Sequence, residues 1–127
     1  MIAAMPVLLG RVRALLEGSA IVQEIILVET REFSSAQYFF KLRATLTGDH
    51  QLQVRLYVNG VHVDYAYQLF SDEPVIRWDN KEEYPALSTF PHHFHTANGH
   101  VVVSELTGDP LSDLPVVLSA LEHFLAI

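Results

Sequence analysis

Residues 75–95 concentrate the side chains of this chain that could do chemistry. The stretch holds the only Trp, an Arg, an adjacent Asp–Asn pair and three of the seven histidines. Groups of this kind are costly to bury unpaired, so they either pair with one another or face something that reacts or binds. Neutral imidazole exchanges protons near neutral pH, and a guanidinium stabilises negative charge. The candidate residues are Arg77, Asp79, Asn80, His92, His93 and His95.

Metal-independent cleavage of a phosphodiester is one reaction that these residue types would support. A ribonuclease of this kind needs a general base near the ribose 2′-OH and a cation that stabilises the charge on phosphorus. His92, His93 or His95 would transfer the proton. Arg77 would stabilise the charge, and Asp79 would orient one of the rings. This hypothesis requires no metal and no cofactor.

Two other functions are open for the same stretch. On an extended segment, residues two apart point to the same side, so His93 and His95 could ligate one ion, with Asp79 or His100 completing the set. Against a metal, the chain has no Cys and no H-E-x-x-H motif. The remaining alternative is a non-enzymatic protein-binding domain, in which Asp79 and Asn80 cap a turn and the histidines satisfy loop carbonyls.

Composition narrows the class of protein. The 127 residues, 50% of them hydrophobic, are expected to form a single domain over 1–127. A formal charge of −7 argues against general nucleic-acid coating unless the eight Lys and Arg cluster locally. No apolar run approaches the roughly 18–20 residues of a membrane span, and the first residues lack a basic n-region. A cytoplasmic protein without membrane association is therefore expected.

Hydrophobic patterning predicts an α+β fold. Alternation with period two from 37 to 69 predicts three antiparallel strands with one apolar face. Asn59-Gly60 predicts a two-residue hairpin loop that sets Val58 opposite Val61, and 48–50 is expected to form the preceding loop. Further elements are predicted as strands at 24–32, 75–78 and 100–106, a long loop over 79–98, and helices over 6–17 and from 109–110 onward. The expected architecture is an antiparallel meander of four to six strands, with the N- and C-terminal helices packed on its apolar face.

The predicted register also gathers basic residues on the polar face of the sheet. The simple interpretation is a solvated face with one Arg55–Asp64 cross-strand pair, worth at most about 1 kcal/mol. The alternative is an anion-binding platform on an otherwise acidic protein. Its members would be Lys41, Arg43, Arg55, Tyr57 and His62.

One family resemblance rests on the order of residues between 65 and 95. The segments Tyr65-x-Tyr67-Gln68, Ile76-Arg-Trp-Asp-Asn80, Pro85 and Thr89-Phe-Pro-His-His93-x-His95, followed by Ser104 and a closing helix, resemble the TumE-like family of small prokaryotic toxin–antitoxin proteins. The resemblance covers roughly residues 36–126. It implies an α+β toxin with a helix-turn-helix antitoxin as cognate partner, for which ribonuclease-like action on RNA is a proposal.

The same resemblance identifies a signature group and one departure from it. The match supports as signature residues Arg77, Asp79, Asn80, Pro91, His92, His93 and His95. Typical members follow the Asp–Asn pair with Ala-Pro-His-His-Pro, whereas this chain has Lys81-Glu-Glu-Tyr-Pro85 and lacks those two histidines. The added carboxylates of Glu82 and Glu83 would repel a phosphate backbone. A homodimer through a meander edge or the C-terminal helix is a further arrangement that the pattern permits.

Overall fold

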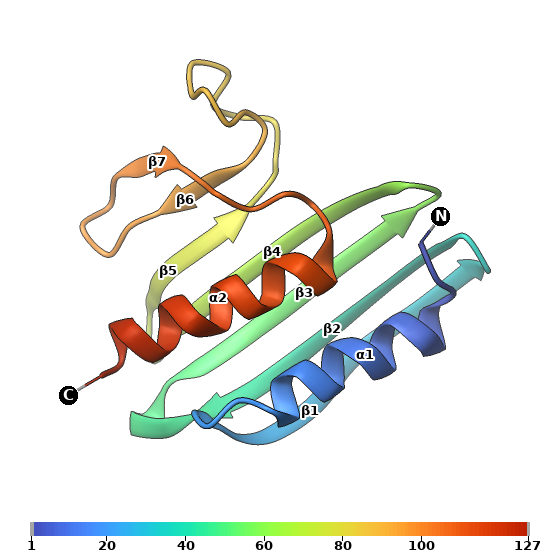
Figure 1. The fold of residues 1–127 in the computed structure, drawn as a ribbon, viewed down its shortest axis with the longest axis horizontal. Helices are drawn as coiled ribbons and strands as arrows, with labels where there is room; N and C mark the ends of the chain where they lie inside the picture. Colours follow the sequence, from blue (N-terminus) through green and yellow to red (C-terminus); the bar gives the residue numbers. More distant parts are fainter. Residues whose placement is uncertain (1, 127) are drawn as a thin grey trace.

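A seven-stranded antiparallel sheet with two helices on one face makes up the fold (Figure 1). The computed structural model describes residues 2–126. Neighbouring strands follow chain order, so the sheet is a continuous meander. The strands are β1 (Val22–Ser34), β2 (Gln37–Leu46), β3 (Gln51–Asn59), β4 (His62–Phe70), β5 (Pro74–Asp79), β6 (His93–His95) and β7 (Val101–Val103). The predicted α+β class is confirmed, with more strands than expected.

The two helices, α1 (Met5–Glu17) and α2 (Pro110–Phe124), lie side by side on the apolar face (Figure 1). Helix α1 turns Leu8, Val12 and Leu16 into the core, at the spacing of one helix face. Helix α2 starts at the N-cap Asp109, whose carboxylate accepts a hydrogen bond from the Leu111 amide. Both helices therefore cover one side of the sheet, and within residues 2–126 the other side has no helical layer.

Both central hairpins differ from the predicted register by two residues. Asn59 pairs with His62, so the two-residue loop is Gly60-Val61 and not Asn59-Gly60. Gly60 has φ of 67° while Val61 does not have positive φ, which suits a turn with glycine at the first central position. Between β2 and β3, the loop is the 3-10 turn Thr47–Asp49 rather than 48–50. A shift of two leaves every side chain on its predicted face but changes its partner.

That shift also changes an expected ion pair. Arg55 lies opposite Ala66 rather than Asp64, and its guanidinium lies over the Phe39 ring, 5.1 Å from the centroid. Asp64 instead faces His62, with 2.8 Å between Oδ1 and Nε2. The predicted Arg55–Asp64 pair is therefore wrong.

The segment predicted as a long loop over 79–98 contains the short strand β6. Its central residue, Phe94, packs on Trp78 with ring centroids 4.7 Å apart, on the helix side of the sheet. Because neighbours along a strand alternate in direction, His93 and His95 point to the opposite side. The Phe90–Pro91 peptide bond, which precedes this strand, is cis.

Trp78, Tyr65 and Tyr67 are buried in the core beneath the helices. Among residues 2–126, neither helix is long and apolar enough to cross a membrane.

Candidate functional site

The face of the sheet without helices, here called the outer face, carries the polar candidate residues. Paired residues on neighbouring antiparallel strands point to the same side, so the register arranges them in rows. One row reads Lys41, Arg55, Ala66, Asp79 and His93 from β2 to β6. The next row reads Arg43, Gln53, Gln68, Arg77 and His95. The basic residues of the central strands and the candidate residues of β5 and β6 therefore share one surface.

Asp79 is the centre of the site. It ends strand β5, and only 4% of the residue is exposed. The Arg77 Nε group donates a hydrogen bond of 2.8 Å to Oδ2, and the Lys81 amide donates one of 3.0 Å to Oδ1. These two donors hold the carboxylate in a single orientation and compensate part of the cost of burying it.

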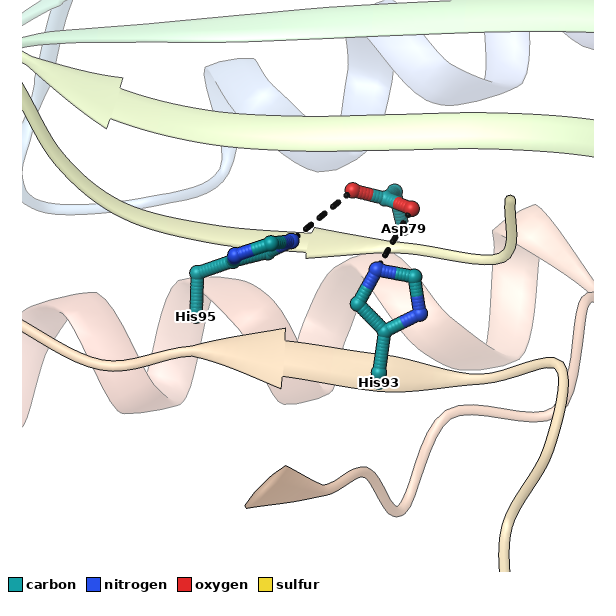
Figure 2. A group of neighbouring side chains, drawn as sticks. All are labelled: Asp79, His93 and His95. Atoms are coloured by element: carbon teal, nitrogen blue, oxygen red, sulfur yellow. Dashed lines mark ion pairs between the residues drawn. The ribbon is translucent and has the colours of Figure 1, made fainter. Parts of the chain in front are cut away.

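Both histidines of β6 point toward this carboxylate (Figure 2). His93 Nε2 lies 2.9 Å from Asp79 Oδ1, and His95 Nε2 lies 3.4 Å from Asp79 Oδ2. His93 is buried, with 1% exposure, whereas 33% of the His95 side chain is exposed. The His93 contact is short enough for a hydrogen bond, but its atoms are not aligned for one. His95 is therefore the histidine of this pair with access to solvent.

Tyr84, in the loop between β5 and β6, covers the two imidazoles. Its ring packs edge-on against His93 and His95, with centroid distances of 4.7 and 6.1 Å. The sequence did not indicate Tyr84 as a site residue, because it lies in the segment where the chain departs from the family pattern. An aromatic between two acidic residues and a proline was the available signal, but its direction depends on how the loop folds back.

A cleft of about 310 Å³ opens beside Asp79 on the outer face. Arg55, Arg77 and Lys81 line the cleft, and of their side chains only that of Arg77 contacts the Asp79 carboxylate. Ala66 lies in the same row between Arg55 and Asp79, and its small side chain leaves the space between them open. Asp64 on the sheet and Glu82 in the loop also line the cleft, so the basic residues share it with carboxylates.

His92 is not part of this cluster. Its Nδ1 lies 2.7 Å from the Tyr65 hydroxyl, among residues that line a separate cavity of about 520 Å³ near the starts of both helices. Burial lowers the pKa of His92 and raises the pKa of Tyr65, so the tyrosine hydroxyl donates to a neutral imidazole. That cavity is larger than the cleft at Asp79, but His92 is the only candidate for catalysis among the residues lining it.

Asn80 has a structural position. Its Oδ1 accepts a hydrogen bond from the Tyr65 amide, and its Nδ2 donates one to the Val63 carbonyl. Because Asn80 is buried and both ends of the amide bind the backbone of β4, it fixes the end of β5 and does not reach the cleft as a free polar group.

The remaining members of the predicted platform lie elsewhere on the outer face. Arg43 lies over the Phe70 ring, 5.6 Å from its centroid, and Lys41 lies opposite Arg55. Tyr57 accepts a hydrogen bond of 2.6 Å from Gln37 Nε2. His62 lies at the hairpin end of β4. The structure thus brings Arg55 to the cleft and places the other four along the same face.

Comparison with known families gives the class of protein. A family model described as Toxin TumE matches residues 11–125, which covers most of the chain. The chain belongs to the TumE toxin family. The resemblance inferred from residues 65–95 is therefore confirmed. Comparison with curated proteins and with solved structures gave no significant match.

Membership of the TumE family supports a toxin role and, in general, an antitoxin partner. The whole Asp79 cluster lies inside the matched region, as do the two arginines of the cleft. The candidate site therefore lies within the matched region, as does nearly all of the chain.

Proposed function

We propose that this TumE toxin acts on a phosphate-bearing target, RNA in particular, in the cleft beside Asp79. One observation carries the proposal: the sheet register sets Arg55 and Arg77 beside a buried carboxylate that two histidines face. Guanidinium groups hold phosphate oxygens in a fixed geometry. Imidazole next to a carboxylate is suited to proton transfer near neutral pH.

The groups divide into two roles. Arg77 and Arg55 would bind the phosphate and stabilise the charge that develops on it. The Asp79–His93–His95 cluster would supply the base that takes the proton from a ribose 2′-OH. The 2′ oxygen then bonds to phosphorus, and the bond to the 5′ oxygen breaks as that oxygen takes up a proton from water. In a metal-independent form of this reaction His95 is the base, because His93 is buried.

The distribution of charge favours one path for a polyanion. Lys81 Nζ lies 4.0 Å from a Glu83 carboxylate oxygen, so the loop presents little free positive charge. Lys41 and Arg43 lie across the outer face from the cleft, on strand β2. An RNA strand would therefore run over β2, β3 and β4 toward Asp79, away from the acidic loop.

Replacement of His95 by alanine tests the role of the cluster. We expect His95→Ala to remove growth inhibition on induced expression, because the solvent-facing imidazole is lost while the buried core is kept. His100→Ala is the matched control, since His100 is exposed in the adjacent turn between β6 and β7. It should remain as toxic as the wild type. Full toxicity of a folded His95→Ala protein would rule out this role and favour a non-enzymatic toxin that acts by binding another protein.

Filling the cleft tests the substrate role separately from the cluster. Ala66→Leu adds a side chain between Arg55 and Asp79 without changing any titratable group. We expect toxicity and RNA binding to fall about tenfold or more, because the phosphate would lose access to the arginines. Binding to a short RNA can be measured by fluorescence anisotropy. Ala3→Leu is the control, because Ala3 lines the other cavity. It should leave RNA binding unchanged.

A further inference from the structure

Asp79, His93 and His95 converge on one point of the outer face (Figure 2). Each offers one ligand atom, and these atoms all lie within 4.8 Å of one another. A tetrahedral ion with bonds of about 2.1 Å holds its ligand atoms roughly 3.4 Å apart. Small side-chain rotations would bring the three atoms to that spacing.

The tautomer of His93 follows from its other ring nitrogen. Nδ1 lies 3.0 Å from the Pro91 carbonyl oxygen, which can only accept, so Nδ1 carries the hydrogen and donates. In the neutral ring this leaves a lone pair on Nε2. A backbone carbonyl that fixes Nδ1–H and directs Nε2 inward is the usual support of a metal-bound histidine.

The inward nitrogen of His93 is an unpartnered polar atom. Among residues 2–126, no group forms a hydrogen bond with this buried Nε2, although Asp79 Oδ1 is 2.9 Å away. A lone pair and a carboxylate at this distance repel, so a positive charge belongs between them. A shared proton would require the two atoms to be aligned. An ion held by three ligands lies off the line between any two of them and fits the misalignment.

We propose that Asp79, His93 and His95 bind one divalent transition-metal ion, Zn²⁺ or a close analogue. Two imidazoles and one carboxylate suit such ions, whereas Mg²⁺ and Ca²⁺ prefer oxygen ligands alone. Three protein ligands leave a position for water. Arg77 and the Lys81 amide act as positioning groups, because they fix the carboxylate from outside.

The metal site deepens the proposed function. Only the role of the ion in RNA cleavage rests on that function. With the ion bound, its hydroxide would replace the His95 ring as the base that accepts the 2′-OH proton and becomes water. Binding of the ion itself depends on the three ligands and can be measured without any RNA.

Zinc binding to the purified, untagged chain tests the inference by calorimetry. We expect one Zn²⁺ per chain and no comparable binding of Mg²⁺. His95→Gln should weaken Zn²⁺ binding by about a hundredfold or more, since loss of even a supporting group costs about 10–100-fold. His62→Ala is the matched control, because His62 also faces a carboxylate on the outer face but lies outside the cluster. It should bind Zn²⁺ like the wild type.

A second measurement needs no variant. Co²⁺ added to the wild-type protein should give the visible absorption of a cobalt ion with nitrogen and oxygen ligands, and Zn²⁺ should displace it. Equal Zn²⁺ binding by wild type and His95→Gln, or absence of the cobalt bands, would overturn the metal site. If these fail while His95→Ala still removes toxicity, the proposed function stands with His95 as a free base. If zinc binds and RNA is untouched, the metal site stands and the RNA target fails.

Discussion

Asp79→Asn is expected to abolish toxicity while the protein stays folded. The amide has nearly the shape of the carboxylate but removes the negative charge that Arg77 and the two histidines of β6 face. Asp79 orients the histidine that transfers the proton, so its loss should remove much of the about 10²–10⁴-fold that a positioned proton-transfer group contributes. Growth after induced expression, with the fold checked by circular dichroism, measures the effect.

The free energy of unfolding of Asp79→Asn shows whether a loss of toxicity comes from lost chemistry or from lost folding. Breaking the hydrogen bonds of a buried carboxylate costs about 1–3 kcal/mol, so Asp79→Asn should unfold at lower urea concentration but remain native in buffer. Asp72→Asn serves as the control, because Asp72 is exposed in the turn between β4 and β5. It should change neither toxicity nor stability. Retention of toxicity by Asp79→Asn would contradict the central place of this carboxylate.

Asp113→Ala is expected to cause the largest loss of stability, about 3 kcal/mol in the free energy of unfolding, the upper value for loss of hydrogen bonds to a charged group. Asp113 lies in the first turn of α2 and is 1% exposed. Its carboxylate accepts hydrogen bonds from the Thr107 amide, the Thr107 hydroxyl and the Gly108 amide, at 2.8–2.9 Å. Alanine would remove the acceptor that ties the segment before α2, Thr107 and Gly108, to the first turn of the helix. Urea denaturation followed by tryptophan fluorescence measures the change through Trp78.

The N-cap residue of the same helix provides the comparison. The Asp109 carboxylate accepts hydrogen bonds from the Leu111 amide and the Ser112 hydroxyl at an exposed position. Asp109→Ala should cost about 1 kcal/mol, the usual effect of losing an N-cap. Equal losses in the free energy of unfolding for the two variants would show that the Asp113 hydrogen bonds are not the main interaction between α2 and the segment that precedes it.

The sequence predicts which face of the sheet each side chain occupies more clearly than it predicts which residue lies opposite on the neighbouring strand. Alternation over 37–69 decides which side chains enter the core, and the structure agrees. It does not decide between registers two residues apart, because both set apolar residues opposite apolar residues. Turn geometry decides the register. In the turn between β3 and β4, Gly60 is the residue that takes positive φ. The Arg55–Asp64 pair was wrong for this reason.

Strand β6 and the residues around Asp79 show a second limit. Three residues are too few for a period to be visible, and the sequence His93-Phe94-His95 was part of a predicted loop. Its pairing with β5 brings both histidines to Asp79, a grouping that the sequence offered only as one of several. Tyr84 and Asp113 could not be assigned in advance, since their contacts come from segments distant in the chain or from a folded loop.

Incubation of purified protein with a defined RNA is the most direct test of the cleft as the site of toxin action. Wild type and Asp79→Asn would be compared at equal concentration, each with and without a metal chelator, and the products separated by gel electrophoresis. We predict that the wild type cleaves the RNA and that Asp79→Asn leaves it intact. Cleavage at the same rate by both proteins, or intact RNA with a wild-type protein that inhibits growth, would contradict a phosphate-directed reaction at Asp79.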